Sequence, residues 1–305
     1  MPTPQLIFGG LNIGSGGFNN EQDVSELLAK LSSLGIRRID TAATYPNSCP
    51  GLSEQLLGKC GAGDRGFVID TKILATGEAP LCADAIDSSI NVLYCHAPDP
   101  NTPMSETAAE LDRQYKLGNF KILGLSNHTP AQISSFTSIC EEQQQHNFAI
   151  RPSVVQGQYN MLFRGPEHEL LPYLHSRGIP FIAYSPLAGG FLTGLFTTTQ
   201  GGGDLLSGTR FEDGNPTGEW YKRVYDRPEA HRAVRELLSG GMMRLTELAL
   251  RWLFHHSLLT DKDAVVLGAS TIAQLEQNVQ DIAKGPLPSD VLALVDEVCG
   301  VNTGE

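Results

Sequence analysis

The stretch IRRIDTAATY (residues 36–45) joins a short apolar run to polar residues at its end, and this pattern decides how the fold is interpreted. The pattern returns in GFVIDTK (66–72) and in NVLYCH (91–96). In a parallel sheet the carboxyl end of each strand opens into the cleft above the sheet, where barrel enzymes keep their reactive groups. We therefore expect one proton-donating site built from the polar residues at these ends, which are Asp40, Tyr45, Lys72 and His96.

Short apolar runs alternate with longer segments of helical period along the chain, which is typical of βα units and a parallel sheet. Eight such units fit one large α/β barrel domain over residues 1–305, although the length alone would also allow two ordinary domains. The stretch FGGLNIGSGG (8–17) does not contain the G-x-G-x-x-G fingerprint, so a Rossmann domain is disfavoured. The expected strands are residues 5–8, 36–40, 67–71, 91–96, 121–126, 153–156, 180–184 and 264–268.

Composition argues against several other functions. The chain has 34 acidic and 22 basic residues, a net charge of −12, and no cluster of Lys and Arg that could follow a phosphate backbone, so we expect no nucleic-acid partner. No apolar stretch approaches the roughly 18 residues of a membrane span, and the first residues do not resemble a signal peptide. We therefore expect no membrane partner and a cytoplasmic location. The six cysteines have no metal-ligand spacing, so we expect no metal.

Two loops rich in small residues follow the seventh and eighth predicted strands, SPLAGGFLTG (185–194) and GASTIAQLEQN (268–278). In eight-stranded barrels these loops commonly hold a phosphate with the help of a helix N-terminus. Ser270 or Thr271 could cap such a helix. Between the seventh strand and its helix, residues 197–220 lack a regular period, which predicts a long loop of the kind that often forms a lid.

The order of the motifs carries a family likeness. IDTAATYPN (39–47), SEQLLG (53–58), DTK (70–72), LYCHAPDP (93–100), GLSNH (124–128), VVQGQYN (154–160) and the two loops above occur in sequence. With these motifs the chain resembles the aldo-keto reductases, most closely the aflatoxin-aldehyde-reductase group and its fungal relatives. The resemblance covers nearly the whole chain and implies a TIM barrel.

The resemblance also implies NADPH as cofactor and the reduction of an aldehyde or ketone to an alcohol, in detoxification or as a tailoring step of fungal secondary metabolism. Tyr45 would donate the proton, and Lys72 and Asp40 would form the pair that tunes the pKa of Tyr45. His96 would orient the carbonyl of a small-molecule substrate. A free tyrosine has a pKa of about 10, and a nearby ammonium group such as that of Lys72 is expected to lower it. A homodimer is compatible with this picture.

The same likeness assigns the cofactor and substrate residues. Tyr184 would stack on the nicotinamide ring, and Ser126, Asn127 and Gln156 would bond its carboxamide. Arg210 would approach the adenosine 2′-phosphate, which favours NADPH over NADH because a guanidinium bonds a phosphate dianion in two places. Tyr221 and Arg223 resemble substrate-pocket residues that would act with His96. The remaining expected cofactor contacts are Asp40, Ser185, Pro186, Leu187, Gly189, Gly268, Ser270, Gln274, Gln277 and Asn278.

The chain departs from the family in the third βα unit. Only 23 residues separate Lys72 from His96, roughly a dozen fewer than in relatives. A crossover needs at least about 10 to 12 residues, so a shortened unit can still join strands three and four. We expect His96 to be the displaced member of the site. Two explanations stand, a divergent enzyme with an open pocket or a sequence that has lost a segment. The alternative function is a cofactor-binding regulatory or scaffold protein with weak or no turnover.

Overall fold

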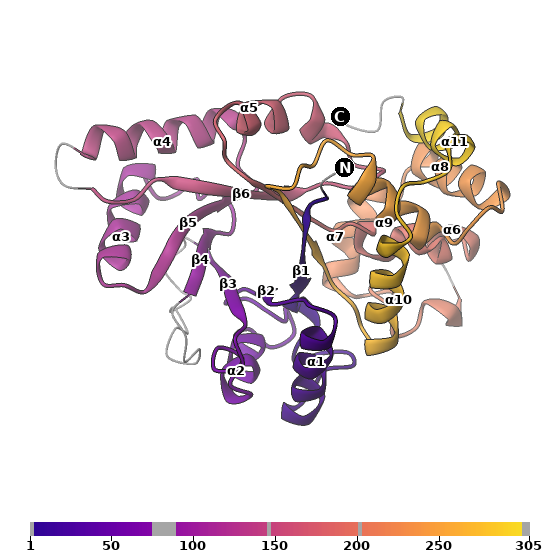
Figure 1. The fold of residues 1–305 in the computed structure, drawn as a ribbon, viewed down its shortest axis with the longest axis horizontal. Helices are drawn as coiled ribbons and strands as arrows, with labels where there is room; N and C mark the ends of the chain where they lie inside the picture. Colours follow the sequence, from indigo (N-terminus) through magenta and orange to yellow (C-terminus); the bar gives the residue numbers. More distant parts are fainter. Residues whose placement is uncertain (1–2, 75–89, 145–147, 201–202, 301–305) are drawn as a thin grey trace.

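The computed structural model describes residues 3–74, 90–144, 148–200 and 203–300. Eight parallel strands pair in chain order and close into a barrel, with β8 returning to β1 (Figure 1). The TIM-barrel prediction is therefore confirmed. The strands are β1 (Gln5–Gly9), β2 (Arg38–Asp40), β3 (Val68–Ile73), β4 (Ile90–Cys95), β5 (Phe120–Ser126), β6 (Pro152–Gln158), β7 (Phe181–Tyr184) and β8 (Ala264–Leu267).

Helices surround the barrel and follow the strands in sequence (Figure 1). No helix within the described residues is both long and apolar enough to cross a membrane. The α-helices are α1 (Glu21–Ser33), α2 (Leu52–Lys59), α3 (Met104–Lys116), α4 (Pro130–Gln144), α5 (Leu170–Ser176), α6 (Leu195–Thr198), α7 (Pro216–Tyr225), α8 (Pro228–Ser239), α9 (Leu245–His255), α10 (Ile272–Ala283) and α11 (Ser289–Cys299).

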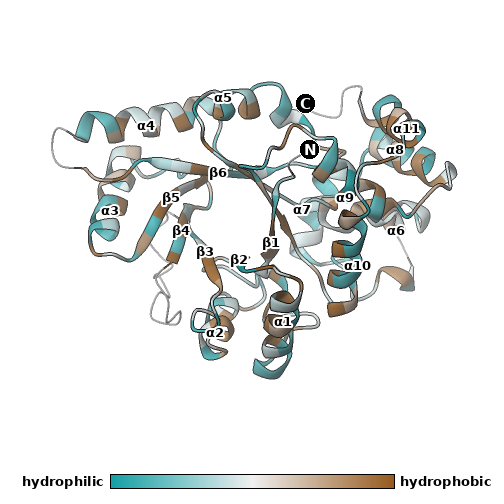
Figure 2. Ribbon diagram, viewed as in Figure 1, coloured by the Kyte–Doolittle hydropathy of each residue, from teal (hydrophilic) through white to brown (hydrophobic). Residues whose placement is uncertain are grey.

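Local sequence explains where these helices begin and which face they bury. The Asn20 side chain accepts a hydrogen bond from Asp23 N at 3.0 Å and caps α1. Apolar residues at helical spacing then point at the sheet, and Leu27 and Leu31 are fully buried. Figure 2 shows the result, since α1 and α2 each carry hydrophobic and hydrophilic residues on different sides. These amphipathic helices cover the outside of the barrel.

Side chains alternate between the inside of the barrel and the helix layer. On β4, Tyr94 packs inside the barrel with residues of β1, β6, β7 and β8. Its neighbours Leu93 and Cys95 pack outward in the main core with Leu111 of α3. Alternation therefore places every second residue of a strand toward the axis, and the last inward residue at the cleft.

The segment 197–220 is more ordered than its sequence predicts. It contains the end of α6, a 3-10 helix at Asp204–Leu206 and the start of α7. Asn215 caps α7 by accepting from Thr217 N and Gly218 N, and Pro216 occupies its first turn. The prediction of a long irregular loop was therefore wrong over 216–220, because a capped helix begins inside a glycine-rich stretch.

The shortened third unit does not prevent regular pairing. Strands β3 and β4 pair in parallel, with Thr71 opposite Leu93 and Lys72 opposite Tyr94. Most of the connection, residues 75–89, lies outside the described residues, so the expected short helix is not tested. The carboxyl ends of both strands nevertheless reach the same edge of the barrel.

Candidate active site

Four polar residues meet at the carboxyl ends of β2, β3 and β4, and we call them the tetrad. Asp40 is the last residue of β2, Lys72 lies near the end of β3 and His96 directly follows β4. Tyr45 stands in the loop after β2, where its N–H donates to Ala42 O at 2.9 Å. The gathering predicted from the strand ends is thus present, whereas the role of each residue stays a prediction.

A buried ion pair forms the floor of this site. Lys72 Nζ donates to Asp40 Oδ2 at 2.5 Å and to Thr41 O at 2.8 Å. The side chains of Lys72 and Asp40 are 1% and 4% exposed. From across the barrel Gln156 Nε2 donates to Asp40 Oδ1 at 2.8 Å. Burying two charges is tolerated only when they are paired and hydrogen-bonded, and this pair meets both conditions.

The rings of Tyr45 and His96 stand above the ion pair. Their centroids are 5.8 Å apart and their planes meet at 78°. Lys72 Nζ lies 5.1 Å from the centroid of the Tyr45 ring. The backbone of His96 is held on both sides, since its N–H donates to Ile73 O at 2.8 Å and its C=O accepts from Asn127 Nδ2 at 2.9 Å. The expected displacement of His96 from the other three was therefore wrong.

Burial controls the protonation of His96. Burial, and then the nearby charge of Lys72, lowers the pKa of His96 to about 4. The imidazole is thus neutral near neutral pH, the state in which one ring nitrogen carries a proton and the other does not. Its Nδ1 is buried and has no hydrogen-bond partner among the residues described. A neutral imidazole beside a tyrosine can donate a hydrogen bond to a carbonyl oxygen.

Burial also raises the pKa of Tyr45 above its ordinary value, and the negative charge of Asp40 adds to this effect. The positive charge of Arg210 opposes it. We expected the Lys72 ammonium to lower this pKa, but burial and the carboxylate of Asp40, which is paired with Lys72, raise it instead. The phenol therefore keeps its proton through the neutral range and is available as a proton donor.

The residues expected at the nicotinamide end lie around the tetrad. Tyr184, the last residue of β7, donates from its hydroxyl to Asn127 Oδ1 at 2.9 Å. Asn127 has a left-handed backbone with φ of 61° and also donates to Ser126 Oγ at 3.2 Å. Ser126 ends β5 and is buried, and Gln156 on β6 bonds Asp40 as described. These side chains form one polar rim from β5 to β7.

The loop after β7 is shaped by positive φ angles. Ser185 has φ of 56°, and Gly189 has φ of 67°. A Cβ at Gly189 would lie 2.5 Å from the Tyr221 ring, so only glycine fits there. Ser185 Oγ lies 2.5 Å from Tyr221 Oη. Pro186 is buried and Leu187 half-buried in the turn between them. Tyr221 of α7 is thereby fixed against this loop.

The loop after β8 leads into a capped helix. Thr271 Oγ1 accepts from Gln274 N at 3.2 Å, so the N-cap of α10 is Thr271 and not Ser270. Ser270 N donates to Gln274 Oε1 at 2.9 Å. Gly268 and Ser270 are exposed at the cleft edge. Further along α10, Asn278 is largely buried, while Gln277 donates to Asp281 on its own helix.

Arg210 connects the insertion after β7 with the loops of β1 and β8. Its Nη2 donates to Asn12 Oδ1 at 3.4 Å, and its guanidinium lies 5.2 Å from the centroid of the Tyr221 ring. Asn12 in turn donates to Ala269 O at 3.2 Å. No motif in the sequence indicated Asn12, whose only signal was its place in a glycine-rich stretch after β1. Arg223 is exposed on another face of α7 than buried Tyr221, so the structure does not bring Arg223 to the site.

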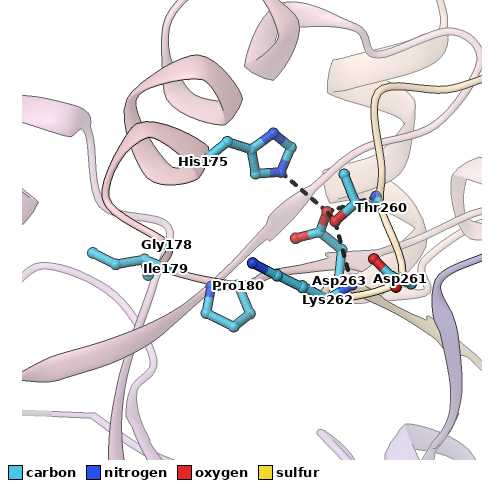
Figure 3. Close-up of a pocket in the computed structure, with 8 residues that line it drawn as sticks. All are labelled: His175, Gly178, Ile179, Pro180, Thr260, Asp261, Lys262 and Asp263. Atoms are coloured by element: carbon cyan, nitrogen blue, oxygen red, sulfur yellow. Dashed lines mark hydrogen bonds and ion pairs between the residues drawn. The ribbon is translucent and has the colours of Figure 1, made fainter.

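A separate hollow of about 240 Å³ lies at the opposite end of the barrel (Figure 3). It is lined by the end of α5 and by residues that precede β7 and β8. There the Asp263 carboxylate accepts from His175 Nε2 at 3.0 Å, Thr260 N at 2.7 Å and Phe181 N at 2.7 Å. Polar residues at the amino ends of barrel strands support stability, whereas chemistry sits at the carboxyl ends. The tetrad, at the carboxyl ends, is therefore the candidate active site.

Comparisons with known proteins agree with this geometry. The model of the aldo/keto reductase family matches residues 5–299. Aflatoxin B1 aldehyde reductase member 2 of Rattus norvegicus is 32% identical over 333 aligned positions, which cover 98% of this chain and 88% of the relative. That alignment is longer than this chain, so the relative has residues that this chain lacks.

Two fungal proteins are similar to the same degree. An aldo-keto reductase of Pseudocercospora fijiensis is 34% identical, with 90% of this chain and 97% of the relative covered. Aldo-keto reductase pigE of Monascus ruber is 30% identical, with 96% and 93% covered. The family match, the closed barrel and the tetrad at its carboxyl end lead to one conclusion. The chain belongs to the aldo/keto reductase family and is an oxidoreductase that uses a nicotinamide cofactor.

Proposed function

We propose that the protein reduces an aldehyde or ketone to an alcohol with NADPH as the hydride source. The observation that carries this proposal is the pairing of two neutral proton donors, Tyr45 and His96, above the Asp40–Lys72 ion pair. Carbonyl reduction needs a donor that stabilises the growing negative charge on oxygen and then protonates it. The tetrad supplies both functions at one place.

The side chains of the cleft fit a nicotinamide dinucleotide. Arg210 makes a single long hydrogen bond within the described part of the chain, so most of its five donors are available for phosphate. The capped N-terminus of α10 and Gly189 after β7 offer backbone N–H groups to an anion. The bound cofactor supplies hydride chemistry that no amino-acid side chain can provide.

The chain's own residues then have defined tasks. His96 donates a hydrogen bond to the substrate oxygen and holds the carbonyl beside Tyr45. The Tyr45 hydroxyl gives its proton to that oxygen as negative charge develops. Lys72 lies 5.1 Å from the centroid of the Tyr45 ring and stabilises the phenolate that results, while Asp40 keeps Lys72 in place. Tyr184 and Asn127 would hold the nicotinamide next to this group.

NADPH is preferred to NADH in this proposal because of Arg210. The 2′-phosphate distinguishes the two cofactors, and a planar guanidinium can bond it in two places. For the substrate, the relatives include an aflatoxin aldehyde reductase and fungal aldo-keto reductases. We propose a small carbonyl compound, reduced either in aldehyde detoxification or in a tailoring step of fungal secondary metabolism.

The experiment follows the absorbance of NADPH after addition of 4-nitrobenzaldehyde or a dicarbonyl to the purified protein. We expect consumption of NADPH that is lost in Tyr45→Phe, while Tyr115→Phe serves as the matched control because Tyr115 packs against Phe120 away from the tetrad. NADPH binding measured by fluorescence should persist in both variants. Binding without Tyr45-dependent turnover would contradict the proposal and favour a cofactor-binding regulatory or scaffold protein.

A further inference from the structure

A second group of buried polar contacts lies on the helix side of the two strands that carry the ion pair. Asp40 and Lys72 face the cleft, and neighbouring residues of a strand point to opposite faces. The hydroxyls of the adjacent threonines, Thr41 and Thr71, are accordingly buried behind the strands, where α2 covers them. Each threonine hydroxyl bonds one of two consecutive residues at the start of α2.

Glu54 contacts β3 from the helix side. Its carboxylate accepts from Thr71 Oγ1 at 2.5 Å, and the residue is only 3% exposed. Its second oxygen, Oε2, is buried without a partner in the described part of the chain. A buried carboxylate oxygen that lacks a partner costs free energy, so this group is not explained by stability alone. Burial raises the pKa of Glu54, and the Thr71 hydrogen bond and the charge of Lys72 partly oppose this effect.

Ser53 contacts the end of β2 and the loop that carries Tyr45. Its Oγ lies 2.8 Å from Thr41 Oγ1 and donates to Gly10 O at 3.0 Å. Its N–H donates to Tyr45 O at 3.1 Å. A Cβ at Gly10 would lie 3.3 Å from Ser53 Oγ and 3.1 Å from Asp40 O, so the three segments meet at close range.

We propose that Ser53 and Glu54 are positioning residues for proton transfer, because they fix from the helix side the strand ends that carry Asp40 and Lys72 and the loop that carries Tyr45. They touch neither substrate nor cofactor and act through Thr41, Thr71 and the Tyr45 carbonyl. The inference rests on the proposed function, in which Lys72 must lie beside the Tyr45 ring. The two backbones are also tied directly, since Thr41 N donates to Asp70 O at 2.8 Å.

The test removes the hydrogen bond between Thr71 and Glu54 while leaving the four tetrad residues unchanged. Thr71→Val keeps the shape of the side chain but cannot bond Glu54, and Glu54→Gln keeps an acceptor oxygen for Thr71. We expect Thr71→Val to lower kcat about tenfold without a matching change in KM, the size of effect that a small misplacement causes. Glu54→Gln should retain most of kcat. Thr137→Val on α4, which loses a bond to Ile133 O, is the matched control.

A second readout does not depend on turnover. Lysine labelled with ¹³C at Cε gives a signal for Lys72, assigned by its absence in Lys72→Met. Thr71→Val should move that signal, while Glu54→Gln and Thr137→Val should leave it in place. The positioning role is overturned if Thr71→Val leaves both kcat and the Lys72 signal at wild-type values, or if Glu54→Gln is as damaged as Thr71→Val. A protein without NADPH turnover would refute the proposed function, and the Lys72 signal would still decide the positioning.

Discussion

Replacing Lys72 by methionine should destabilise the fold strongly, because it leaves the Asp40 carboxylate buried without its cation. The two side chains are 1% and 4% exposed, and their atoms Nζ and Oδ2 are 2.5 Å apart. In the variant Asp40 would retain one hydrogen bond, from Gln156 Nε2 at 2.8 Å. Methionine fills much of the volume of lysine, so the loss is mainly electrostatic.

The magnitude follows from this environment. Removing one partner of a buried ion pair costs about 3 to 5 kcal/mol, and the remaining bond from Gln156 places Lys72→Met near the lower end. Removing both charges together is about neutral in comparable cases. Asp40→Asn keeps an oxygen that accepts from Gln156, so the double variant Asp40→Asn with Lys72→Met should recover most of the lost stability.

Urea unfolding, followed by circular dichroism and by fluorescence, measures this difference. Lys59→Met is the matched control, because Lys59 pairs with Glu21 at 3.7 Å and both side chains are more than half exposed. This surface pair should contribute little. A loss of less than about 1 kcal/mol in Lys72→Met, or a double variant that is less stable than Lys72→Met, would contradict this role of the ion pair.

Three further predictions concern pH, cofactor choice and the loop after β7. The pKa of His96 in the folded protein, about 4, lies below its ordinary 6.5, so the unfolded chain binds more protons between these two pH values. The free energy of unfolding should therefore fall as the pH drops through that window. Urea unfolding should show a smaller pH dependence in His96→Asn. Arg210→Met should weaken NADPH binding at least tenfold, about 1.4 kcal/mol, and NADH binding little, as fluorescence titration measures; equal losses would contradict the 2′-phosphate contact. Gly189→Ala should raise the KM for NADPH in steady-state assays, because its Cβ would strike Tyr221 and φ is 67°, and an unchanged KM would show that this loop does not contact the cofactor.

Most of the fold could be predicted from the sequence because the strands are short apolar runs, and several of them end at or near a polar residue. The expected strand at 36–40 is observed as Arg38–Asp40, and the one at 264–268 as Ala264–Leu267. The same pattern, a polar residue at or near the end of an apolar run, correctly placed Lys72 and His96 at one edge of the barrel. Local chemistry was sufficient here, because the carboxyl ends of parallel strands meet wherever the barrel closes.

The errors arose where long-range packing decides. The direction of the Tyr45 pKa shift depends on burial and on the nearby charge of Asp40, and neither is visible in a motif. The distinction between Tyr221 and Arg223 depends on which face of α7 meets the loop after β7. Asn12 acquires its place through a partner, Arg210, that stands 198 positions away.

The position of His96 shows why a shortened connection does not decide the site. The carboxylate of Asp70 on β3 accepts from Asn91 Nδ2 at 2.8 Å and from Val92 N at 3.2 Å, so side-chain bonds fasten the start of β4. On the other side β4 pairs with β5 from Ile90 to Cys95, where Gly124 leaves room for the Tyr94 ring, which a Cβ would approach to 2.3 Å. Register in β4 is therefore set by its two neighbouring strands and not by the length of the chain that precedes it. A βα unit of this barrel can lose residues and still deliver its last inward side chain to the cleft, because closure of the sheet fixes the strand ends.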